Sequence, residues 1–316
     1  MNLEGSGQEE ISLALVTYNQ SDLLKQFLEN YLRDGCQAVQ LTVVDDGSDD
    51  ATPEILASHA ANKRIHLHRL PHGSISKARN HALRNSPTPW LAFSDTDCQL
   101  DHCYFETLRS IPDKFAASKA VEGAIFPPPG PKPPFTHSLA NPTGGTFATA
   151  NMAFHVSSVL GLGGFDEAFQ NFREDTDLAL TIFEHSGPIP FCPDLVVVHP
   201  HLPRSFGKSL SRAFTSQAQI IRSEVRLFEK HPKNYRLVRH SDNVRATLWR
   251  WCWKYSARYA KENLRYLVGT PELTTYQRFA GIRPACAAIV VAVWEQICVG
   301  ILCMLQLDKI MRLKSK

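Results

Sequence analysis

The most informative segment of the chain runs from Trp90 to Asp97 and reads WLAFSDTD. Its first four residues are apolar, as expected for a buried strand. The strand stops abruptly in Asp95 and Asp97, two carboxylates one residue apart. Ligands of open α/β folds bind at the carboxyl edge of the sheet. The segment therefore predicts a site for a metal ion and a phosphate; the alternative is a helix cap, which would use one acid only.

Strands and helices alternate around this segment. Apolar strand-like runs precede it, and between them apolar residues repeat at helical spacing, the first such segment beginning at Ser21 and Asp22 as its expected cap. This alternation predicts the α/β class, with a mainly parallel twisted sheet flanked by helices. The expected strands cover 11–17, 39–44, 65–70 and 90–94, and the expected helices cover 21–35, 52–61 and 76–85.

The alternation breaks at the proline-rich run Pro127–Pro134, which suits neither a helix nor a central strand. Strand-like pieces resume at 146–154 and 195–198, so we expect a surface excursion inside one domain rather than a domain boundary. Residues 1–203 are thus predicted to form one domain. Residues 204–316 are predicted to form a helical, basic C-terminal region.

Composition and charge narrow the class of protein. With 316 residues and 43% hydrophobic content, the chain can bury a large core, which excludes the disordered class. The eight cysteines are scattered without a CxxC pair, and the first ten residues are polar, so we expect a reducing cytosol, no zinc site and no signal peptide. Residues 1–200 carry a net charge of −11 and residues 201–316 one of +14.

Polar side chains also follow the first two predicted strands. Thr17, Tyr18 and Asn19 end the first strand, and Asp46 lies in the sequence DDGS after the second. A carboxylate at this edge suits hydrogen bonds from the base or ribose of a nucleotide. The alternative for Asp45–Ser48 is a tight turn, because Asp and Gly are preferred there.

A small-residue turn at His72–Ser74 precedes a helix whose first turns carry Lys77 and Arg79. A cation at a helix N-terminus can hold a phosphate. The alternative is that both residues are ordinary surface cations.

Two further acids, Glu174 and Asp175, begin another predicted helix. Asn171 and Glu174 have the spacing of a capping box, which favours a structural role for Glu174. Asp175 lies about 100° further around the helix and is a candidate general base. The alternative is that first-turn acids only complement the helix dipole.

His199 follows the strand predicted at 195–198 and is a candidate third metal ligand beside Asp95 and Asp97. The alternative is an ordinary hydrogen-bonded structural histidine.

Taken together, six motifs in this order resemble the family 2 glycosyltransferases with the GT-A fold. The resemblance implies an inverting, metal-dependent hexosyltransferase-type enzyme that moves one sugar from a nucleotide-diphosphate sugar to an acceptor hydroxyl. Its nucleotide-sugar half would span about 1–100 and its acceptor half about 101–203. The motifs are Val16–Asn19, Asp45–Ser48, Ser76–Asn80, Asp95–Asp97, Gly163–Asp166 and Glu174–Asp175.

The resemblance also implies roles by position. The segment Thr143–Asn151 looks like the family's acceptor-side strand, and the processive signature Q-x-x-R-W is absent because Gln219–Arg222 is followed by Ser223. Addition of a single sugar is therefore expected. The implied sites are Thr17, Asn19 and Asp46 for the nucleoside, Arg79 for the diphosphate, Asp95 and Asp97 for Mn²⁺ or Mg²⁺, and Asp175 as the base. Beside these we expect, from the residues themselves, Tyr18, Lys77 and Thr96 in the donor site, His199 as a further metal ligand and Glu174 as a further catalytic residue.

Two other classes of function compete with this interpretation. A nucleotidyltransferase on a related sheet would also need a metal and a nucleotide, but it normally shows a Gly-rich basic loop where Tyr18–Ser21 stands. A catalytically silent, membrane-binding scaffold would not need the acids at 95, 97 and 175.

The C-terminal region mixes basic and aromatic residues, as in Trp249–Tyr255, which suits an anionic membrane surface. The alternative is packing between helices; nucleic-acid binding is not expected. Residues 285–307 are mostly apolar, but Glu295 and Gln296 at their centre favour a helix at the membrane interface or packed on the protein over a span. We therefore expect a cytoplasmic, membrane-peripheral enzyme with a saccharide or lipid-linked acceptor in cell-envelope polysaccharide, lipopolysaccharide or glycolipid synthesis.

Overall fold

The structure is a computed structural model that describes residues 10–35, 39–130, 136–169, 171–203 and 210–239. The chain divides into two compact units. Unit 1 comprises residues 1–130 and 138–201, and unit 2 comprises residues 131–137 and 202–316. All the candidate site residues predicted from the sequence lie in unit 1.

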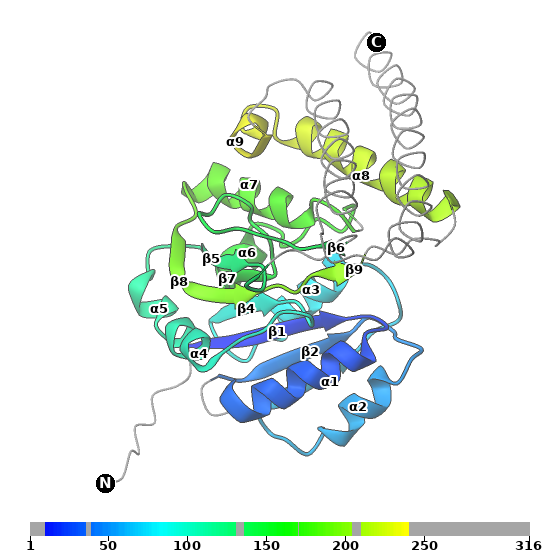
Figure 1. Ribbon diagram of the computed structural model, residues 1–316. Coiled ribbons are helices and arrows are strands. Elements are labelled where there is room, and N and C mark those ends of the chain that lie inside the picture. Colours follow the sequence, from blue (N-terminus) through cyan, green and yellow to red (C-terminus); the bar gives the residue numbers. More distant parts are fainter. Residues whose placement is uncertain (1–9, 36–38, 131–135, 170, 204–209, 240–316) are drawn as a thin grey trace, which may run out of the picture. The chain divides into compact units, whose positions relative to one another are not determined.

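Unit 1 is built on a seven-stranded sheet with the order β3-β2-β1-β4-β7-β5-β8 (Figure 1). Within the described part of the chain, only β7 runs antiparallel to its neighbours in this sheet. The prediction of a mainly parallel sheet is therefore confirmed. The strands are β1 (Ile11–Thr17), β2 (Leu41–Asp45), β3 (Ile65–Arg69), β4 (Trp90–Ser94), β5 (Ala120–Phe126), β7 (Asn151–His155) and β8 (Phe191–Val198).

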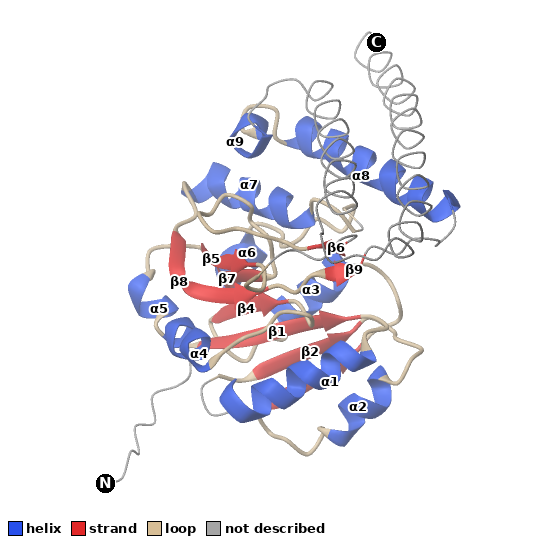
Figure 2. Ribbon diagram, in the orientation of Figure 1, coloured by secondary structure: helices blue, strands red, loops and turns tan. Residues whose placement is uncertain are grey.

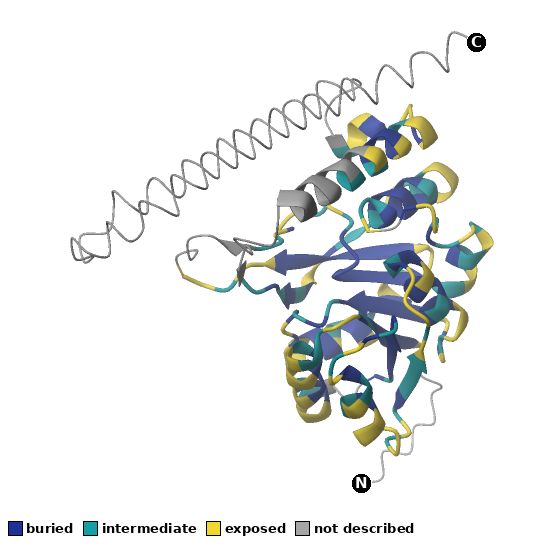
Figure 3. Cartoon of the chain, turned by 90° about the vertical axis from the view of Figure 1, so that its right-hand side faces the viewer, coloured by how far each residue is buried: buried dark blue, intermediate teal, exposed yellow. Residues whose placement is uncertain are grey.

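Helices cover both faces of this sheet, so the strands form the buried middle layer (Figures 2 and 3). One apolar cluster joins Leu13 of β1 to the face that holds Phe27 and Tyr104. The other joins Phe93 of β4 to the opposite face, which holds Leu178. The helices are α1 (Ser21–Asn30), π-helical η1 (Tyr31–Gly35), α2 (Thr52–Ser58), α4 (His102–Arg109) and α5 (Ile111–Lys114) on the first face, and α3 (Ile75–Arg84), α6 (Val156–Gly161) and α7 (Glu174–Ser186) on the second.

Most predicted elements of the first hundred residues appear within a few residues of their expected bounds, and β1 and β4 match them. Two differences have physical causes. The strand predicted at 146–154 begins only at Asn151, because the residues before it form an irregular loop. The expected cap at Ser21 and Asp22 is wrong: the Ser21 amide donates to Asp50 Oδ2 at 2.9 Å, so an acid from another loop closes the helix. The predicted proline-rich loop is described only at 127–130, where it is irregular.

Unit 2 contains the short antiparallel pair β6 (Thr136–His137) and β9 (Leu202–Pro203), and the helices α8 (Leu210–Lys230) and α9 (Tyr235–Arg239). Tyr235 is buried, donates its hydroxyl to Glu224 Oε1 at 2.7 Å and stacks edge-on with Phe228. The aromatic run Trp249–Tyr255 and the apolar residues 285–307 lie outside the described residues. No helix among the described residues has the length and apolar character needed to cross a membrane.

Candidate active site

The segment Asp95–Asp97 after β4, which we call the acidic edge, forms a turn and not the start of a helix. The amide of Cys98 donates to the Asp95 carbonyl at 3.0 Å, which closes the turn. The next helix, α4, is capped instead by Asp101, whose Oδ1 accepts from the Tyr104 amide at 2.8 Å. The alternative of a helix cap at Asp95–Asp97 is therefore wrong, and both acids remain available for other chemistry.

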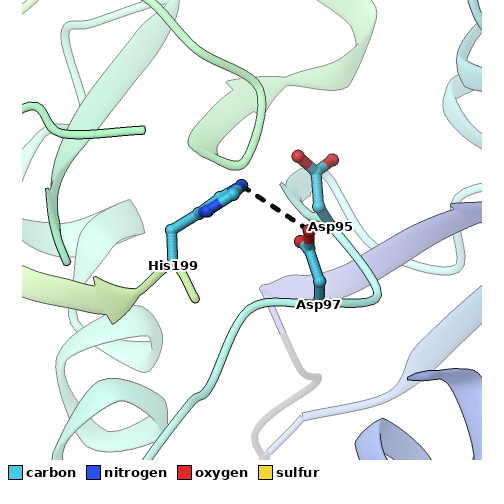
Figure 4. A group of neighbouring side chains, drawn as sticks. All are labelled: Asp95, Asp97 and His199. Carbon is cyan, nitrogen blue, oxygen red and sulfur yellow. Dashed lines mark ion pairs between the residues drawn. The ribbon is translucent and has the colours of Figure 1, made fainter. Parts of the chain in front are cut away.

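His199 joins these two acids at the same edge of the sheet. Its position is set by β8, which lies parallel to β5 and brings the residue after Val198 to the carboxyl edge. His199 Nε2 lies 3.6 Å from Asp97 Oδ2, and one ligand atom from each of Asp95, Asp97 and His199 falls within 4.8 Å of the others. Figure 4 shows the imidazole and the two carboxylates converging from two segments.

The donor atoms of this triad fit a divalent cation. Carboxylate oxygens with one imidazole nitrogen suit Mn²⁺, and carboxylates suit Mg²⁺. Asp97 Oδ1 is buried and has no hydrogen-bond partner among the residues that the structure describes, a costly arrangement that a bound cation would relieve. Desolvation raises the pKa of the Asp95 carboxyl, and repulsion from Asp97 adds to this rise while Arg79 opposes it.

Arg79 connects this edge to the first turn of α7. Its guanidinium is buried, donates from Nη1 to Glu174 Oε1 at 2.7 Å and places Nη2 3.9 Å from Asp95 Oδ1. It also lies over the Phe165 ring, 5.6 Å from the centroid. Burial raises the pKa of Glu174, and the nearby Asp175 raises it further, whereas Arg79 lowers it. Contact of Arg79 with a diphosphate stays a prediction.

The capping box expected from Asn171 and Glu174 is wrong. The helix begins at Glu174 itself, and the preceding residue, Arg173, has a left-handed φ of 73° with no side-chain cap. Glu174 is instead directed into the site by Arg79. Asp175 is half-buried, and its Oδ1 accepts from the Thr176 amide at 2.6 Å and from the Thr176 hydroxyl at 3.2 Å.

The loops after β1 and β2 bind each other at the edge predicted for the nucleoside. The Asn19 amide donates to Ser48 Oγ at 2.9 Å, and Asn19 Oδ1 accepts from the Asp49 amide at 2.9 Å. Asp45 Oδ1 accepts from the Ser48 amide at 2.9 Å, so the tight-turn interpretation is correct for Asp45. Thr17 is buried beside this turn, with its hydroxyl unpaired among the described residues.

Asp46 has a different environment from Asp45. Its Oδ1 accepts from the Gly73 amide, and its Oδ2 lies 3.1 Å from His72 Nδ1. The His72 ring stacks on Tyr18, with centroids 3.9 Å apart and an interplanar angle of 15°. Tyr18 is 42% exposed, so this pair forms an aromatic surface next to a buried carboxylate.

The remaining two donor-site predictions lie in distinct places. Lys77 is exposed in the first turn of α3, and its amide donates to Ser74 Oγ at 3.3 Å, which makes Ser74 the cap of this helix. Thr96 is buried and donates its hydroxyl to Gln20 Oε1, which ties the acidic turn to the loop after β1.

Three residues of this region were missed from the sequence. His72 carried a signal only as part of a small-residue turn. Asn80 is buried, donates to the Phe165 carbonyl and accepts from its amide, which joins α3 to the loop before α7. Glu122, a single acid within the apolar run AVEGAIF, is buried on β5. An isolated acid in such a run is itself a signal that a partner lies elsewhere in the fold.

Comparison with known proteins adds independent observations. The sequence profile of "Glycosyl transferase family 2" matches residues 12–116. Glycosyltransferase GlyA of Streptococcus pneumoniae serotype 4 is 28% identical over 114 residues, which are 36% of this chain and 16% of that protein. The uncharacterized glycosyltransferase YibD of Escherichia coli is 25% identical over 103 residues, or 32% of this chain and 30% of that protein. The chain thus spans less than a third of the length of these relatives.

Solved structures resemble the chain over most of its length. The mannosyltransferase PcManGT from Pyrobaculum calidifontis, in complex with GDP-Man and Mn²⁺, has a TM-score of 0.58 at 15% identity and covers 95% of this chain and 88% of that one. TarS 1–349 of S. aureus, in complex with UDP-GlcNAc, has a TM-score of 0.55 at 14% identity and covers 95% and 92%. At these identities the likeness concerns the fold.

Proposed function

Because this chain belongs to glycosyl transferase family 2 through residues 12–116 and has the GT-A fold, we propose that it transfers one sugar from a nucleotide-diphosphate sugar to an acceptor hydroxyl with inversion. The observation that carries the proposal is the convergence of Asp95, Asp97 and His199 within 4.8 Å at the carboxyl edge of the sheet. The neighbouring structures that hold GDP-Man or UDP-GlcNAc support a donor of this class.

Asp95, Asp97 and His199 would hold Mn²⁺ or Mg²⁺, which when bound would stabilise negative charge on the departing diphosphate. Thr17, Asn19 and Asp46 would line the nucleoside pocket, with the exposed faces of Tyr18 and His72 beside the base. Lys77 is exposed at the start of α3, where a cation and a helix N-terminus together attract phosphate. Arg79 would contribute its positive charge from the buried side of the edge.

Asp175 is the proposed base of the reaction. Thr176 fixes its Oδ1, and the buried pair of Glu174 with Arg79 fixes the first turn of α7 on which it stands. Asp175 would accept the proton of the acceptor hydroxyl as that oxygen attacks the anomeric carbon. Attack from the face opposite the diphosphate inverts this centre in one displacement, and no covalent enzyme intermediate is needed.

The first test is calorimetric titration with UDP, GDP and dTDP, each with and without Mn²⁺. We expect one nucleotide to bind in a Mn²⁺-dependent way, and Asp95→Ala/Asp97→Ala to abolish this binding. Asp22→Ala/Glu106→Ala is the matched control, because it removes the same charge from exposed positions on α1 and α4. The proposal is wrong if no nucleotide binds the wild type, or if the double variant binds normally.

The proposed membrane contact and acceptor class rest on the C-terminal part of the chain. The net charge of +14 over residues 201–316 supports a basic region, from about residue 204, that contacts anionic lipid on the cytoplasmic face of the membrane. A saccharide or lipid-linked acceptor of the cell envelope would be reached there. Sedimentation of the full chain with phosphatidylglycerol vesicles, against phosphatidylcholine vesicles, tests this contact. Equal sedimentation with both kinds would contradict it.

A further inference from the structure

A buried glutamate that belongs to none of the motifs lies under the loop before β7. Glu122 is 1% exposed on β5, between β7 and β8. A carboxylate is costly at such a position unless donors satisfy its oxygens. The positions of the groups that donate hydrogen bonds to Glu122 therefore show which segment this residue supports.

Both oxygens of Glu122 are taken by the segment from Asn141 to Phe147, which we call the 141–147 loop. Oε2 accepts from the Gly145 amide at 2.7 Å. Oε1 accepts from the Phe147 amide at 2.5 Å and from Asn141 Nδ2 at 2.8 Å. The loop needs such support at Phe147, a non-glycine residue with a φ of +56°, whereas Gly144 and Gly145 adopt their φ values of +80° and +89° without steric cost. A non-glycine residue at positive φ persists only when its surroundings impose it.

The 141–147 loop leads directly to the acidic edge. Three residues after Phe147, the Ala150 carbonyl accepts a weak hydrogen bond from Cys98 Sγ at 3.9 Å, just beyond Asp97. The next residue, Asn151, pairs with Ser94 at the end of β4, the residue before Asp95. The short segment 147–151 therefore has one end on Glu122 and the other beside the proposed metal ligands.

We propose that Glu122 is a positioning residue for the acceptor. It holds the 141–147 loop in one conformation, and this fixes the buried backbone of 148–151 that enters the acidic edge. This backbone lies on the β7 side of β4, opposite the β1 and β2 loops proposed for the nucleoside, which is the side left for the acceptor saccharide. Glu122 itself touches no substrate. The inference rests on the proposed function and deepens it, since it assigns the acceptor side of the site to a loop set by one buried carboxylate. Small displacements of groups that orient a reactant cost large factors in rate.

The test variant is Glu122→Gln, which keeps the shape but turns one accepting oxygen into an N–H donor facing an N–H group. Hydrogen exchange of the full chain measures the loop directly. We expect the Gly145 and Phe147 amides to exchange at least tenfold faster, with the amides of β1 and β4 unchanged. The matched control is Asp101→Ala, which removes the α4 cap and leaves the loop amides protected. Unchanged exchange at both loop amides in Glu122→Gln would overturn the proposal.

A kinetic arm separates positioning from general damage. UDP-glucose and GDP-mannose with Mn²⁺ are the donor probes, water is the simplest acceptor, and octyl glucoside is the saccharide acceptor. In Glu122→Gln we expect donor Kd and hydrolysis by water within twofold of wild type, and an acceptor KM raised at least fivefold. Equal losses in donor binding and acceptor use would overturn the acceptor role. A change of more than twofold in donor Kd or in hydrolysis by water in Glu122→Gln would also overturn the acceptor role, whether or not octyl glucoside accepts the sugar.

Failure of the underlying function is recognised separately. A wild type that binds no nucleotide and hydrolyses no donor would contradict the proposed function and, with it, the acceptor role. The exchange result would then still decide whether Glu122 holds the loop.

Discussion

The loops after β1 and β2 and the loop before β7 are held to the sheet in opposite ways. The first two consist of turn-forming residues at strand ends and bind each other, as Asn19 does with Ser48. The loop before β7 is held by Glu122, a residue inside a strand. The difference teaches that turn-forming residues are enough to shape a short loop at a sheet edge, whereas the longer loop before β7 is held by a buried carboxylate from a strand.

The largest expected effect is on the chemistry, at the first turn of α7. Asp175→Asn keeps the size of the side chain and removes the proposed base, so we expect kcat to fall by about a thousandfold. Nucleotide Kd with Mn²⁺ should stay within twofold, because the donor residues lie on other elements. Steady-state kinetics and calorimetry measure the two quantities. A variant with full turnover would assign the base to another residue.

The second prediction breaks the ion pair that joins α3 to α7. Arg79→Met leaves Glu174 buried without its partner, and we expect a loss of unfolding free energy of about 3 kcal/mol. Urea unfolding measures the change. Arg79→Met/Glu174→Gln is the matched control, because it removes both charges and should recover most of the loss. If the double variant is as unstable as the single one, the ion pair does not account for the effect.

The third prediction concerns the starts of α1 and α2. Asp50 accepts hydrogen bonds from the amides of Ser21 and Thr52, at the starts of α1 and α2. Asp50→Ala should therefore lower the unfolding free energy by about 1–2 kcal/mol at pH 7. Urea unfolding measures this loss. Asp22→Ala, in the first turn of α1, should lower the unfolding free energy much less, since Asp22 is exposed. Equal losses in the two variants would contradict the capping role.

The contribution of Asp50 to the unfolding free energy should also depend on pH. Burial alone would raise the pKa of Asp50, but hydrogen bonds from Thr52 and Ser21 outweigh it and lower the pKa to about 2. A carboxyl with a depressed pKa stabilises the fold above its unfolded pKa and loses this contribution as pH falls through the folded value. The difference between wild type and Asp50→Ala should thus shrink from pH 4 toward pH 2. A constant difference would show that the charge plays no part.

Much of the first hundred residues was predictable because the signals there are local. Apolar runs that end in acids mark β1, β2 and β4, and parallel strands bring such ends to one edge. The same rule placed His199 beside Asp95 and Asp97, although it lies about a hundred residues further along the chain. Where an apolar run contained an acid, as in Ala120–Phe126, the strand was missed.

Two local signals led to wrong predictions for one reason. Ser21 and Asn171 both have a sequence context typical of helix caps, yet neither acts as one in the structure. Asp50 satisfies the start of α1 from another loop, and Arg79 draws Glu174 into the site. A buried or paired carboxylate gains more from a charged or converging partner than a local cap offers.

The sequence alone determines the class of fold and the acidic edge, because hydrophobic periodicity and the residues at strand ends act over short stretches of chain. Only the tertiary structure decides which acids accept hydrogen bonds from neighbouring loops and which remain available to a ligand. Asp45 and Asp46 are neighbours, yet one closes a turn and the other holds Gly73. Glu122 accepts hydrogen bonds from the loop before β7, and Asp97 keeps a buried oxygen that has no partner in the described part of the chain. That choice depends on which hydrogen-bond donors burial brings within reach, and these lie far apart along the chain.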